Sequence, residues 1–304
     1  MTDAASHSSA PAINVWLVIP VHNRREVTAR CLRHLKELGI PFWMRVLVVD
    51  DGSTDGTADL VAAEFPWVAI LAGNGEWWWA GAIRQGMETA MREGAECICW
   101  LNDDSLPDVG SLELLVRHAC EHGALCGGIC PTGGPGGFAY GGGMMSRGWP
   151  KNCQPMPQPG AVARQVEWLH GNMVAVPAAV WQRIGLPQCR WAKHHFADVE
   201  YTHRAARAGI PVLLLPDATG RADWNDGGSY VSWLDRRLTI QALVCGFWNP
   251  KMWWYAPGVA FFQIRTFGLP GFFRFILLFP KAFAVVLFKL LPRWGGTLDK
   301  TGQP

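Results

Sequence analysis

The chain lacks an apolar leader at its N-terminus and lacks any cysteine spacing of the zinc-site type. Residues 1–11 are polar and rich in Ala and Ser, without a basic start or an apolar core, which predicts a cytosolic location. Of the nine cysteines, Cys126 and Cys130 are closely spaced, but no second pair completes a zinc motif. Because the number is odd and several cysteines lie in apolar runs, we expect buried free thiols.

Acidic residues are absent from residues 236–298, which contain eight Lys and Arg, although the whole chain has 27 basic and 25 acidic residues. This part also lacks an uncharged run of about 20 residues, because Arg265, Arg274, Lys281 and Lys289 interrupt it. A basic, aromatic and apolar region favours helices lying on a membrane surface over nucleic-acid binding. We therefore expect peripheral association with the inner face of the cell membrane and no nucleic-acid partner.

Other arrangements of the same region remain open. It could form a hydrophobic helical cap on the rest of the protein, or an interface that makes the protein a homodimer. Insertion of residues 272–291 into a membrane as a re-entrant hairpin is a third alternative. The length of 304 residues suits one large domain with an appendage. We predict a disordered segment at 1–12, an α/β domain at 13–235 and a C-terminal helical region at 236–304.

Short apolar runs alternate with helical patterns along the first part of the chain. The expected strands are residues 13–20, 44–49, 68–71 and 97–101, and the expected helices are residues 24–38, 57–64, 80–93 and 109–122. Such alternation implies parallel βαβ units.

The composition of the sequence changes after residue 130. Residues 131–160 are rich in Gly and Pro and predict a long irregular loop. A strand pair at 165–176, helices at 178–184 and 198–208 and a strand at 212–215 are expected after it.

Polar side chains follow two of the expected strands directly. Asp50 and Asp51 come after one apolar run, and Asn102, Asp103 and Asp104 come after another. Ligands of open α/β sheets collect beyond the carboxyl ends of the strands. Carboxylate oxygens together with substrate phosphates suit Mg²⁺ or Mn²⁺. The sequence therefore predicts a divalent ion that holds a phosphorylated ligand.

Five segments in order resemble the family-2 glycosyltransferases, which are inverting enzymes that use nucleotide sugars. The segments are residues 19–23 (IPVHN), 48–57 (VVDDGSTDGT), 73–86 (GNGEWWWAGAIRQG), 101–105 (LNDDS) and 197–204 (ADVEYTHR). The tryptophan run resembles a rhamnosyltransferase-like subset. The resemblance implies the GT-A fold, a Rossmann-like and mostly parallel sheet flanked by helices, at residues 13–235. A C-terminal hydrophobic helical membrane-associating region would follow.

The resemblance implies a nucleotide site formed by the loops after the first two strands. Pro20, His22 and Asn23 would line the base and ribose, and Asp50 or Asp51 would accept a hydrogen bond from the base N–H. A carboxylate suits the imide donor of uracil or thymine, so the donor would be of the UDP or dTDP type. The alternative is that this acidic segment forms only a turn and helix cap.

The metal motif of the family, Asp-x-Asp, corresponds here to Asn102, Asp103 and Asp104. Asp104 would ligate Mg²⁺ or Mn²⁺ and reach both phosphates through the ion, while Asn102 and Asp103 would contact the donor. Such an ion stabilises the charge that develops on the leaving diphosphate. Arg84 would also contact the diphosphate. The alternative is a simple turn before a helix.

The third acidic segment would supply the base. Asp198 would take the proton from the acceptor hydroxyl, although Ala197 replaces the carboxylate that many relatives carry beside it. A helix start lowers the pKa of a carboxyl group, whereas a closed site with a phosphate nearby raises it. Arg204 would steady the carboxylates or the phosphates. The alternative role for Asp198 is a helix N-cap.

The sugar and acceptor contacts are assigned to Trp78, Trp79, His170 and Glu200. Three adjacent indoles at residues 77–79 cannot all face one way, so at least one is expected to meet a ligand.

Relatives often carry a histidine where this chain has Trp224. Asp223 or Asp226 could take its place at the metal, and neither His194 nor His195 is assigned as a ligand.

The function expected from these segments is the metal-dependent transfer of a hexosyl or deoxyhexosyl group from a nucleoside diphosphate sugar. The acceptor would be a hydroxyl of a lipid-linked saccharide in envelope polysaccharide synthesis. One alternative is a sugar nucleotidyltransferase, although residues 20–23 do not form its Gly-rich phosphate loop. The other is a catalytically degenerate membrane-bound adaptor, suggested by Asn102, Ala197 and Trp224.

Overall fold

The computed structural model describes residues 13–133, 139–146, 149–152, 162–223, 232–234 and 238–291. The chain forms two compact units. The first, here called the sheet unit, comprises Met1–Lys193 and Ala197–Trp224. The second, the C-terminal unit, comprises His194–Phe196 and Asn225–Pro304.

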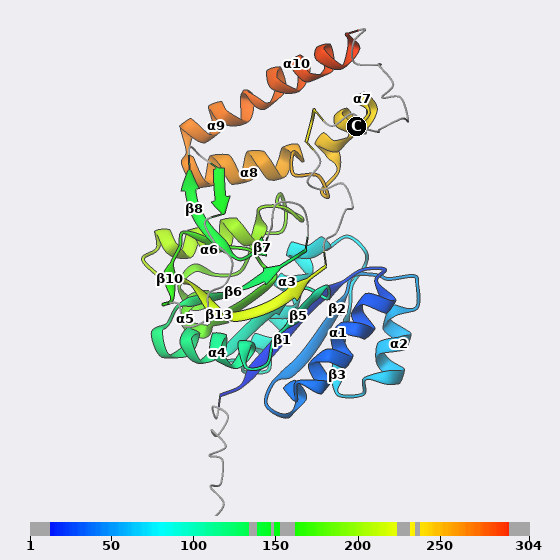
Figure 1. The fold of residues 1–304 in the computed structure, drawn as a ribbon, viewed down its shortest axis with the longest axis vertical. Helices are drawn as coiled ribbons and strands as arrows, with labels where there is room; N and C mark the ends of the chain where they lie inside the picture. The colour runs from blue at the N-terminus through cyan, green and yellow to red at the C-terminus, as the bar shows by residue number, and fades with distance from the viewer. Residues whose placement is uncertain are drawn as a thin grey trace, which may run out of the picture. The chain divides into compact units, whose positions relative to one another are not determined.

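A mixed sheet organises the sheet unit (Figure 1). Its strands within the described residues are β1 (Val15–Val21), β2 (Arg45–Asp50), β3 (Val68–Ala72), β4 (Cys97–Leu101), β5 (Ser105–Pro107), β6 (Leu125–Pro131), β7 (Ala139–Tyr140), β10 (Arg164–Gln165), β12 (Met173–Pro177) and β13 (Val212–Ala222). The order is β10-β13-β6-β12-β4-β1-β2-β3, with β5 paired to β13 and β7 to β6.

The predicted βαβ units are confirmed in the first half of the unit. Strands β3, β2, β1 and β4 are parallel neighbours. Their carboxyl ends therefore share one edge, which is where the acidic segments lie. Further along, β12 runs antiparallel to both β4 and β6, so the sheet is mostly parallel but mixed. This is the predicted fold class.

Helices of the sheet unit follow the apolar periodicity closely. They are α1 (Arg25–Glu37), α2 (Thr57–Glu64), α3 (Trp78–Arg92), α4 (Ser111–His122), α5 (Ala178–Ile184) and α6 (Ala197–Arg207), together with the short 3₁₀ helix η1 (Ile40–Phe42). The expected bounds of α2 and α5 are confirmed. Helix α3 begins two residues earlier than predicted, because the backbone of Trp78 is held by a carboxylate described below.

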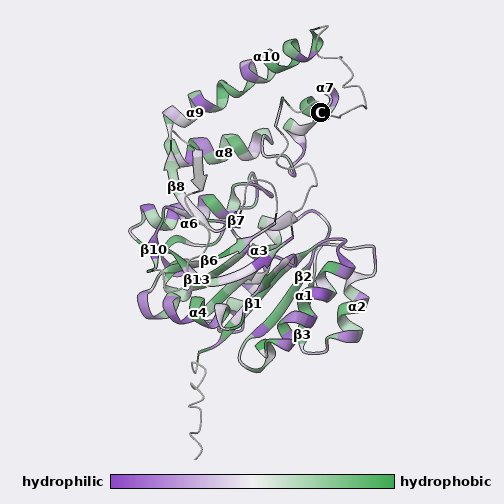
Figure 2. Ribbon diagram, in the orientation of Figure 1, coloured by the Kyte–Doolittle hydropathy of each residue, from purple (hydrophilic) through white to green (hydrophobic). Residues whose placement is uncertain are grey.

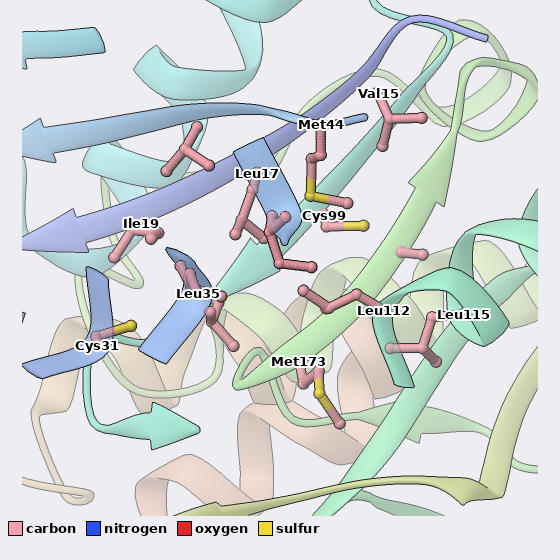
Figure 3. Packing of buried hydrophobic residues seen from close by; sticks show 14 of the residues in the cluster. Val15, Leu17, Ile19, Cys31, Leu35, Met44, Cys99, Leu112, Leu115 and Met173 are labelled. Atoms are coloured by element: carbon pink, nitrogen blue, oxygen red, sulfur yellow. The ribbon is translucent and has the colours of Figure 1, made fainter. Parts of the chain in front are cut away.

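The core lies on both faces of the sheet, as buried parallel strands require. Val15, Leu17 and Ile19 of β1 point to the face covered by α1 and α4, where Leu35 and Leu115 pack beside them (Figure 3).

The alternate β1 residues Trp16 and Val18 pack with Ile83 and Met87 of α3 on the other face. Cys31, Cys97, Cys99, Cys126 and Cys130 are buried free thiols, as expected.

The expectation of an irregular loop over residues 131–160 is wrong for its described part. Strands β8 (Gly142–Ser146) and β9 (Trp149–Asn152) form an antiparallel pair, and β8 also pairs with β11 (Trp168–Leu169) in a separate small sheet. Glycine allows close approach here, since a Cβ on Gly142 would lie 2.6 Å from the carbonyl oxygen of Trp168. The rest of the segment lies outside the described residues.

The strand pair expected at 165–176 is also corrected. Strands β10, β11 and β12 pair with β13, β8 and β4, respectively, rather than with one another.

The C-terminal unit is helical. Its elements are α7 (Ile240–Cys245), the 3₁₀ helix η3 (Gly246–Trp248), α8 (Ala256–Phe267), α9 (Leu269–Ile276) and α10 (Leu278–Leu290). Trp254 is buried and donates its indole N–H to the Leu243 carbonyl at 3.0 Å. Helices α8 and α9 pack closely at Gly271, where a Cβ would lie 1.8 Å from the carbonyl oxygen of Gln263.

One helical stretch in the described residues, Leu269–Leu290, is long and apolar enough to cross a membrane by length and composition. A buried core helix would pass the same test, but only 17% of the most apolar window is buried.

Candidate active site

The loops after β1 and β2 are joined by a set of hydrogen bonds that places the predicted nucleotide residues side by side. Pro20 is the penultimate residue of β1 and pairs with Val49 of β2. His22 Nδ1 bonds the backbone oxygen of Asp51 at 2.6 Å. Asn23 donates its backbone N–H to Ser53 Oγ at 2.8 Å. The two loops therefore form one rigid rim at the edge of the sheet.

Asp50 and Asp51 are both buried, and their carboxylates organise the backbone around them. Asp50 Oδ1 accepts the N–H of Ser53 at 2.9 Å. Asp51 accepts the N–H of Gly75 at 2.9 Å through Oδ1 and that of Trp78 at 2.7 Å through Oδ2. Both oxygens of Asp51 thus hold the loop that leads into α3, while no described residue donates to Oδ2 of Asp50.

The tryptophan run joins the β2 end to the β4 end. Trp78 has φ of 55°, a left-handed conformation that its bond to Asp51 helps to hold. Trp79 donates its indole N–H to Asn102 Oδ1 at 2.8 Å and packs edge-on against Trp100 of β4. The position of Asn102 is therefore set by Trp79.

Arg24 bridges the two aspartates that follow Asn102. Its Nε donates to Asp103 Oδ2 and its Nη2 to Asp104 Oδ2, both at 3.0 Å. Thr28 also donates to Asp103 Oδ2, at 3.1 Å. Burial raises the pKa of Asp103 to about 6, although Arg24 opposes the change. Burial raises the pKa of Asp104 in the same way.

Asp104 retains one buried oxygen, Oδ1, with no hydrogen-bond partner among the described residues. An unsatisfied buried carboxylate oxygen is costly unless a cation or donor meets it. No group of three or more His, Cys, Asp or Glu side chains able to hold a metal exists in the described ranges. A divalent ion here would therefore need ligands beyond Asp104, and donor phosphates fit that requirement.

Asp223 lies beside this carboxylate through the backbone. Its N–H donates to the carbonyl oxygen of Asp104 at 3.1 Å, and its own carboxylate pairs with Arg30. Asp226, the other carboxylate considered for the metal, lies outside the described residues, as does Trp224.

Asp198 stands in the first turn of α6 with its carboxylate held by backbone donors. Oδ2 accepts the N–H of Gly171 at 2.8 Å and Oδ1 that of Val199 at 2.8 Å. Burial raises the pKa of Asp198, and these two hydrogen bonds only partly oppose the rise. A carboxylate with raised proton affinity and fixed orientation can accept a proton from a hydroxyl.

Gly171 brings Asp198 and Trp79 together. A Cβ at Gly171 would lie 2.3 Å from the indole of Trp79 and 3.2 Å from the Cβ of Asp198, so only glycine fits between them. Because Trp79 also binds Asn102, a continuous series of contacts joins the β4 acidic segment to Asp198. The three predicted acidic segments therefore line one region of the sheet edge.

Three residues that were predicted to contact the donor or acceptor, Arg84, Glu200 and His170, make other contacts in the structure. Arg84 pairs with Glu88 one turn further along α3 and donates to the carbonyl oxygen of Pro187 at 3.2 Å. Glu200 is buried and accepts from Arg204 Nε at 3.1 Å, so Arg204 steadies Glu200 rather than Asp198.

His170 packs edge-on against Trp168 and Tyr140, and its Nδ1 accepts the N–H of Gly141 at 3.0 Å. Burial lowers the pKa of His170 to about 4, so the ring is neutral near pH 7. These contacts tie the small sheet to Gly171 and hence to the backbone that holds Asp198.

The roles of Arg24 and Gly171 were not predicted from the sequence. Arg24 directly follows the 19–23 segment, so its position next to the nucleotide loop was a usable signal. The contact of Gly171 with Trp79 joins residues that are 92 positions apart, and no local pattern reveals it. His194 and His195 belong to the C-terminal unit, where His195 Nε2 bonds the Lys251 carbonyl at 2.9 Å.

Comparison with known proteins extends this picture. Residues 16–161 match the family model described as Glycosyl transferase family 2. No curated protein sequence matches the chain at a significant level.

Solved structures with a similar fold include the mannosyltransferase PcManGT from Pyrobaculum calidifontis, in complex with GDP-Man and Mn²⁺. The identity is 16% and the TM-score 0.52, over 93% of this chain and 82% of that one. TarS 1–349 of S. aureus, in complex with UDP-GlcNAc, has 14% identity and a TM-score of 0.54, over 89% and 81% of the two chains.

GalNAc-T7, solved with UDP, GalNAc and Mn²⁺, has 13% identity and a TM-score of 0.56 over 89% of this chain but only 55% of its own. At these identities the likeness concerns the fold. Residues 16–161, just under half of the chain, therefore match glycosyl transferase family 2, and the architecture of the sheet is that of the GT-A fold.

Proposed function

We propose that this protein is an inverting glycosyltransferase that moves a hexosyl or deoxyhexosyl group from a UDP or dTDP sugar to a hydroxyl group of a saccharide acceptor. The observation that carries the proposal is the Asp198 carboxylate, held by two backbone donors and linked through Gly171 and Trp79 to Asn102. Each Asp198 oxygen keeps a second lone pair for the acceptor hydroxyl. Direct attack of that hydroxyl on the anomeric carbon inverts its configuration.

The nucleotide would lie on the rim formed by the loops after β1 and β2. Oδ2 of Asp50 would accept the imide N–H of the base, and Pro20, His22 and Asn23 would line the base and ribose. Asp51 would act indirectly, because both of its oxygens already hold the loop before α3. A solved protein of similar fold, TarS 1–349, was crystallised with UDP-GlcNAc, which supports a uridine donor as one of the two candidates.

The diphosphate would lie at the β4 end. Asp104 would hold Mg²⁺ or Mn²⁺ through Oδ1, and two structures of similar fold contain Mn²⁺. The ion would supply positive charge that stabilises the departing diphosphate. Arg24 keeps Asp103 and Asp104 in place and lies close enough to their carboxylates to contribute charge there. Asn102 would touch the sugar or ribose.

The acceptor would enter beside Asp198, where Trp78, Trp79, His170 and Glu200 were expected to contribute. Of these, Trp79 is adjacent to Gly171 and Asn102 and is the best candidate for direct sugar contact. His170 and Glu200 would act by positioning the backbone and α6. We further propose that the acceptor saccharide is carried on a lipid, in envelope polysaccharide synthesis, which would bring the enzyme to the inner membrane surface.

The decisive test is the Asp198→Asn variant of the full chain. Asparagine keeps the size of the side chain but cannot act as a base, so sugar transfer from the correct donor should fall by about 10²–10⁴-fold. Binding of the nucleoside diphosphate, measured by calorimetry with Mn²⁺, should change less than twofold. Asp59→Asn on α2 is the matched control and should keep full activity. Full transfer by a folded Asp198→Asn protein would refute the assignment.

The pH profile of the wild-type protein adds a second test. The base acts only when ionised, so kcat/KM should fall as the pH drops through the pKa of Asp198. Because burial raises that pKa, the fall should begin at a higher pH than for an ordinary aspartate. Release of diphosphate from a nucleoside triphosphate would instead indicate a nucleotidyltransferase, and the absence of turnover with every donor would indicate an adaptor.

A further inference from the structure

Helices α9 and α10 expose apolar side chains along one continuous stripe. Figure 2 shows that these helices are coloured largely as hydrophobic. The exposed fractions reach 64% for Phe283 and 65% for Leu290. The stripe, here called the apolar stripe, consists of Phe272, Phe273, Ile276, Phe279, Phe283, Leu287 and Leu290.

Two of the three cations in these helices, Arg274 and Lys289, turn toward the protein instead. Lys289 is only 8% exposed, and its Nζ donates to the Leu238 carbonyl at 2.7 Å. The Arg274 guanidinium lies over the ring of Phe267 at 4.9 Å, and its Nη1 is buried without a hydrogen-bond partner among the described residues. A helix facing water shows the opposite pattern, with charges outward and apolar groups inward.

The helical spacing confirms that α10 has two distinct faces. Phe279, Phe283 and Leu287 recur at intervals of four and therefore lie on one side. Leu278, Ala282 and Lys289 are buried and lie on another side. Lys281 is exposed and belongs to neither set; it lies two residues from both Phe279 and Phe283 and therefore on the opposite side of α10 from the apolar stripe.

The protein contacts on the buried side of α10 help to distinguish a helix that crosses a membrane from one that lies in the membrane plane. The Leu269–Leu290 stretch has 22 residues. At about 1.5 Å per residue it is long enough to cross a bilayer core of about 30 Å. A crossing helix, however, would place Lys281, near the middle of the stretch, and the protein contacts of Leu278 and Ala282 within hydrocarbon. Lying in the membrane plane keeps these contacts and places only the apolar stripe in lipid.

We propose that α9 and α10 lie in the plane of an anionic phospholipid membrane and insert the apolar stripe below the headgroups. Charge complementarity identifies the partner, because residues 236–298 contain eight Lys and Arg and no Asp or Glu. A second copy of the chain is a poorer partner, since it would bring two basic regions together with no acidic residue in either to offset the repulsion. The proposal does not depend on the sugar-transfer function.

Flotation of the full chain with vesicles tests it. Wild-type protein should float with vesicles of 3:1 phosphatidylcholine and phosphatidylglycerol, and at least tenfold less of the Phe283→Glu/Leu287→Glu variant should do so. The matched control is Phe42→Glu in the sheet unit, which changes an exposed phenylalanine (92%) outside the apolar stripe and should float like the wild type. Lys281→Glu should weaken binding about fivefold on anionic vesicles only.

Other outcomes overturn the proposal. Equal flotation of the stripe variant and the control would show that the stripe does not meet lipid. A wild-type dimer in ultracentrifugation that the stripe variant converts to a monomer, with vesicle binding unchanged, would identify a second copy as the partner. Protease protection of fragments on both sides of the vesicle membrane would indicate a crossing helix.

Hydrogen exchange provides a measurement that needs no variant. Amides of residues 269–290 in the wild-type protein should exchange at least tenfold more slowly with anionic vesicles than without them. Unchanged exchange in a sample that floats would contradict insertion of these helices. Vesicle binding by a protein that transfers no sugar would leave this proposal standing while refuting the proposed function.

Discussion

In the sheet unit, several carboxylates are buried and paired, whereas in the C-terminal unit apolar side chains are exposed and the cations Arg274 and Lys289 turn inward. Asp51, Asp103 and Asp198 each accept hydrogen bonds inside the sheet unit. Phe283 and Leu290 instead point outward from α10, while Lys289 binds a backbone carbonyl. Both patterns reverse the usual rule that polar groups lie outside and apolar groups inside.

The difference indicates two different ligands. Burying a carboxylate costs free energy unless it is paired, so a cluster of them at one sheet edge indicates a site shaped for a charged ligand. Exposing a continuous apolar stripe costs free energy in water, so it indicates a surface that meets an apolar medium. If the two units have these separate partners, substitutions in one should leave the ligand of the other unaffected.

The largest expected effect comes from Asp104→Asn. Losing the carboxylate that faces the donor phosphates should lower Mn²⁺-dependent transfer by about a thousandfold, equivalent to about 4 kcal/mol of transition-state stabilisation. Vesicle binding should not change. Steady-state kinetics over a range of Mn²⁺ concentrations checks this, with Asp59→Asn as the control. A loss of less than threefold at saturating Mn²⁺ would remove Asp104 from the diphosphate site.

The next effect concerns His170 and acid stability. Its pKa of about 4 lies below the value of about 6.5 expected in the unfolded chain. The unfolded chain therefore binds more protons between these values, and stability present above pH 6.5 is lost as the pH falls toward 4, by about 3 kcal/mol. His170→Asn keeps an acceptor for Gly141 and should flatten this dependence. Urea unfolding at several pH values measures it.

The corresponding control is His122→Asn on α4, which changes an exposed histidine and should retain the wild-type pH dependence. Identical slopes for both variants would show that His170 is not the group responsible.

Arg24→Gln should give an intermediate effect on stability. Removing the shared partner leaves Asp103 and Asp104 close together without a cation, which typically costs 3–5 kcal/mol in a fully buried pair. Because the Arg24 side chain is 29% exposed, we expect about 2 kcal/mol. Urea unfolding in metal-free buffer measures this loss of stability. The control is Arg25→Gln, which changes the exposed arginine next to Arg24. Equal stability of the two variants would argue against the bridge.

A smaller effect is expected from Trp79→Phe. The variant loses the indole donor to Asn102, so stability should fall by about 1 kcal/mol and kcat/KM by about fivefold. Trp67→Phe is a matched control, because the Trp67 indole N–H has no hydrogen-bond partner in the described part of the chain. A larger loss in the control would show that packing, rather than the Asn102 bond, dominates.

The smallest effect should come from Phe283→Glu, assayed with a water-soluble acceptor and without vesicles. Donor turnover should stay within twofold of the wild type, because the substitution changes an exposed residue of the C-terminal unit. A large loss under these conditions would show that the two units do not act independently.

Local sequence patterns predicted most of the sheet unit. The expected helices at 57–64 and 178–184 agree with α2 and α5, and the buried runs before Asp50 and Asn102 agree with β2 and β4. These elements depend on periodicity and turn chemistry, which neighbouring residues determine. The acidic segments were therefore expected at one sheet edge, because carboxyl ends of parallel strands share that edge.

Non-local contacts could not be predicted in this way. Strands β8 and β9 form within a Gly/Pro-rich segment because their hydrogen bonds come from pairing, not from β propensity. The pairing of Arg204 with Glu200, rather than with Asp198, depends on which face of α6 is buried. The positions of charged residues along a sequence do not specify such partners.

The sequence by itself determined the alternating strands and helices up to residue 122, the three acidic segments and the basic, acid-free region at residues 236–298. These follow from residue type and spacing along the chain. Only the tertiary structure decided that Arg24 bridges Asp103 and Asp104, that Gly171 joins Trp79 to Asp198, and that Arg274 and Lys289 turn inward. Each of these depends on side chains from distant segments meeting in three dimensions, and the energy of such contacts is set by burial and geometry, which residue spacing does not specify.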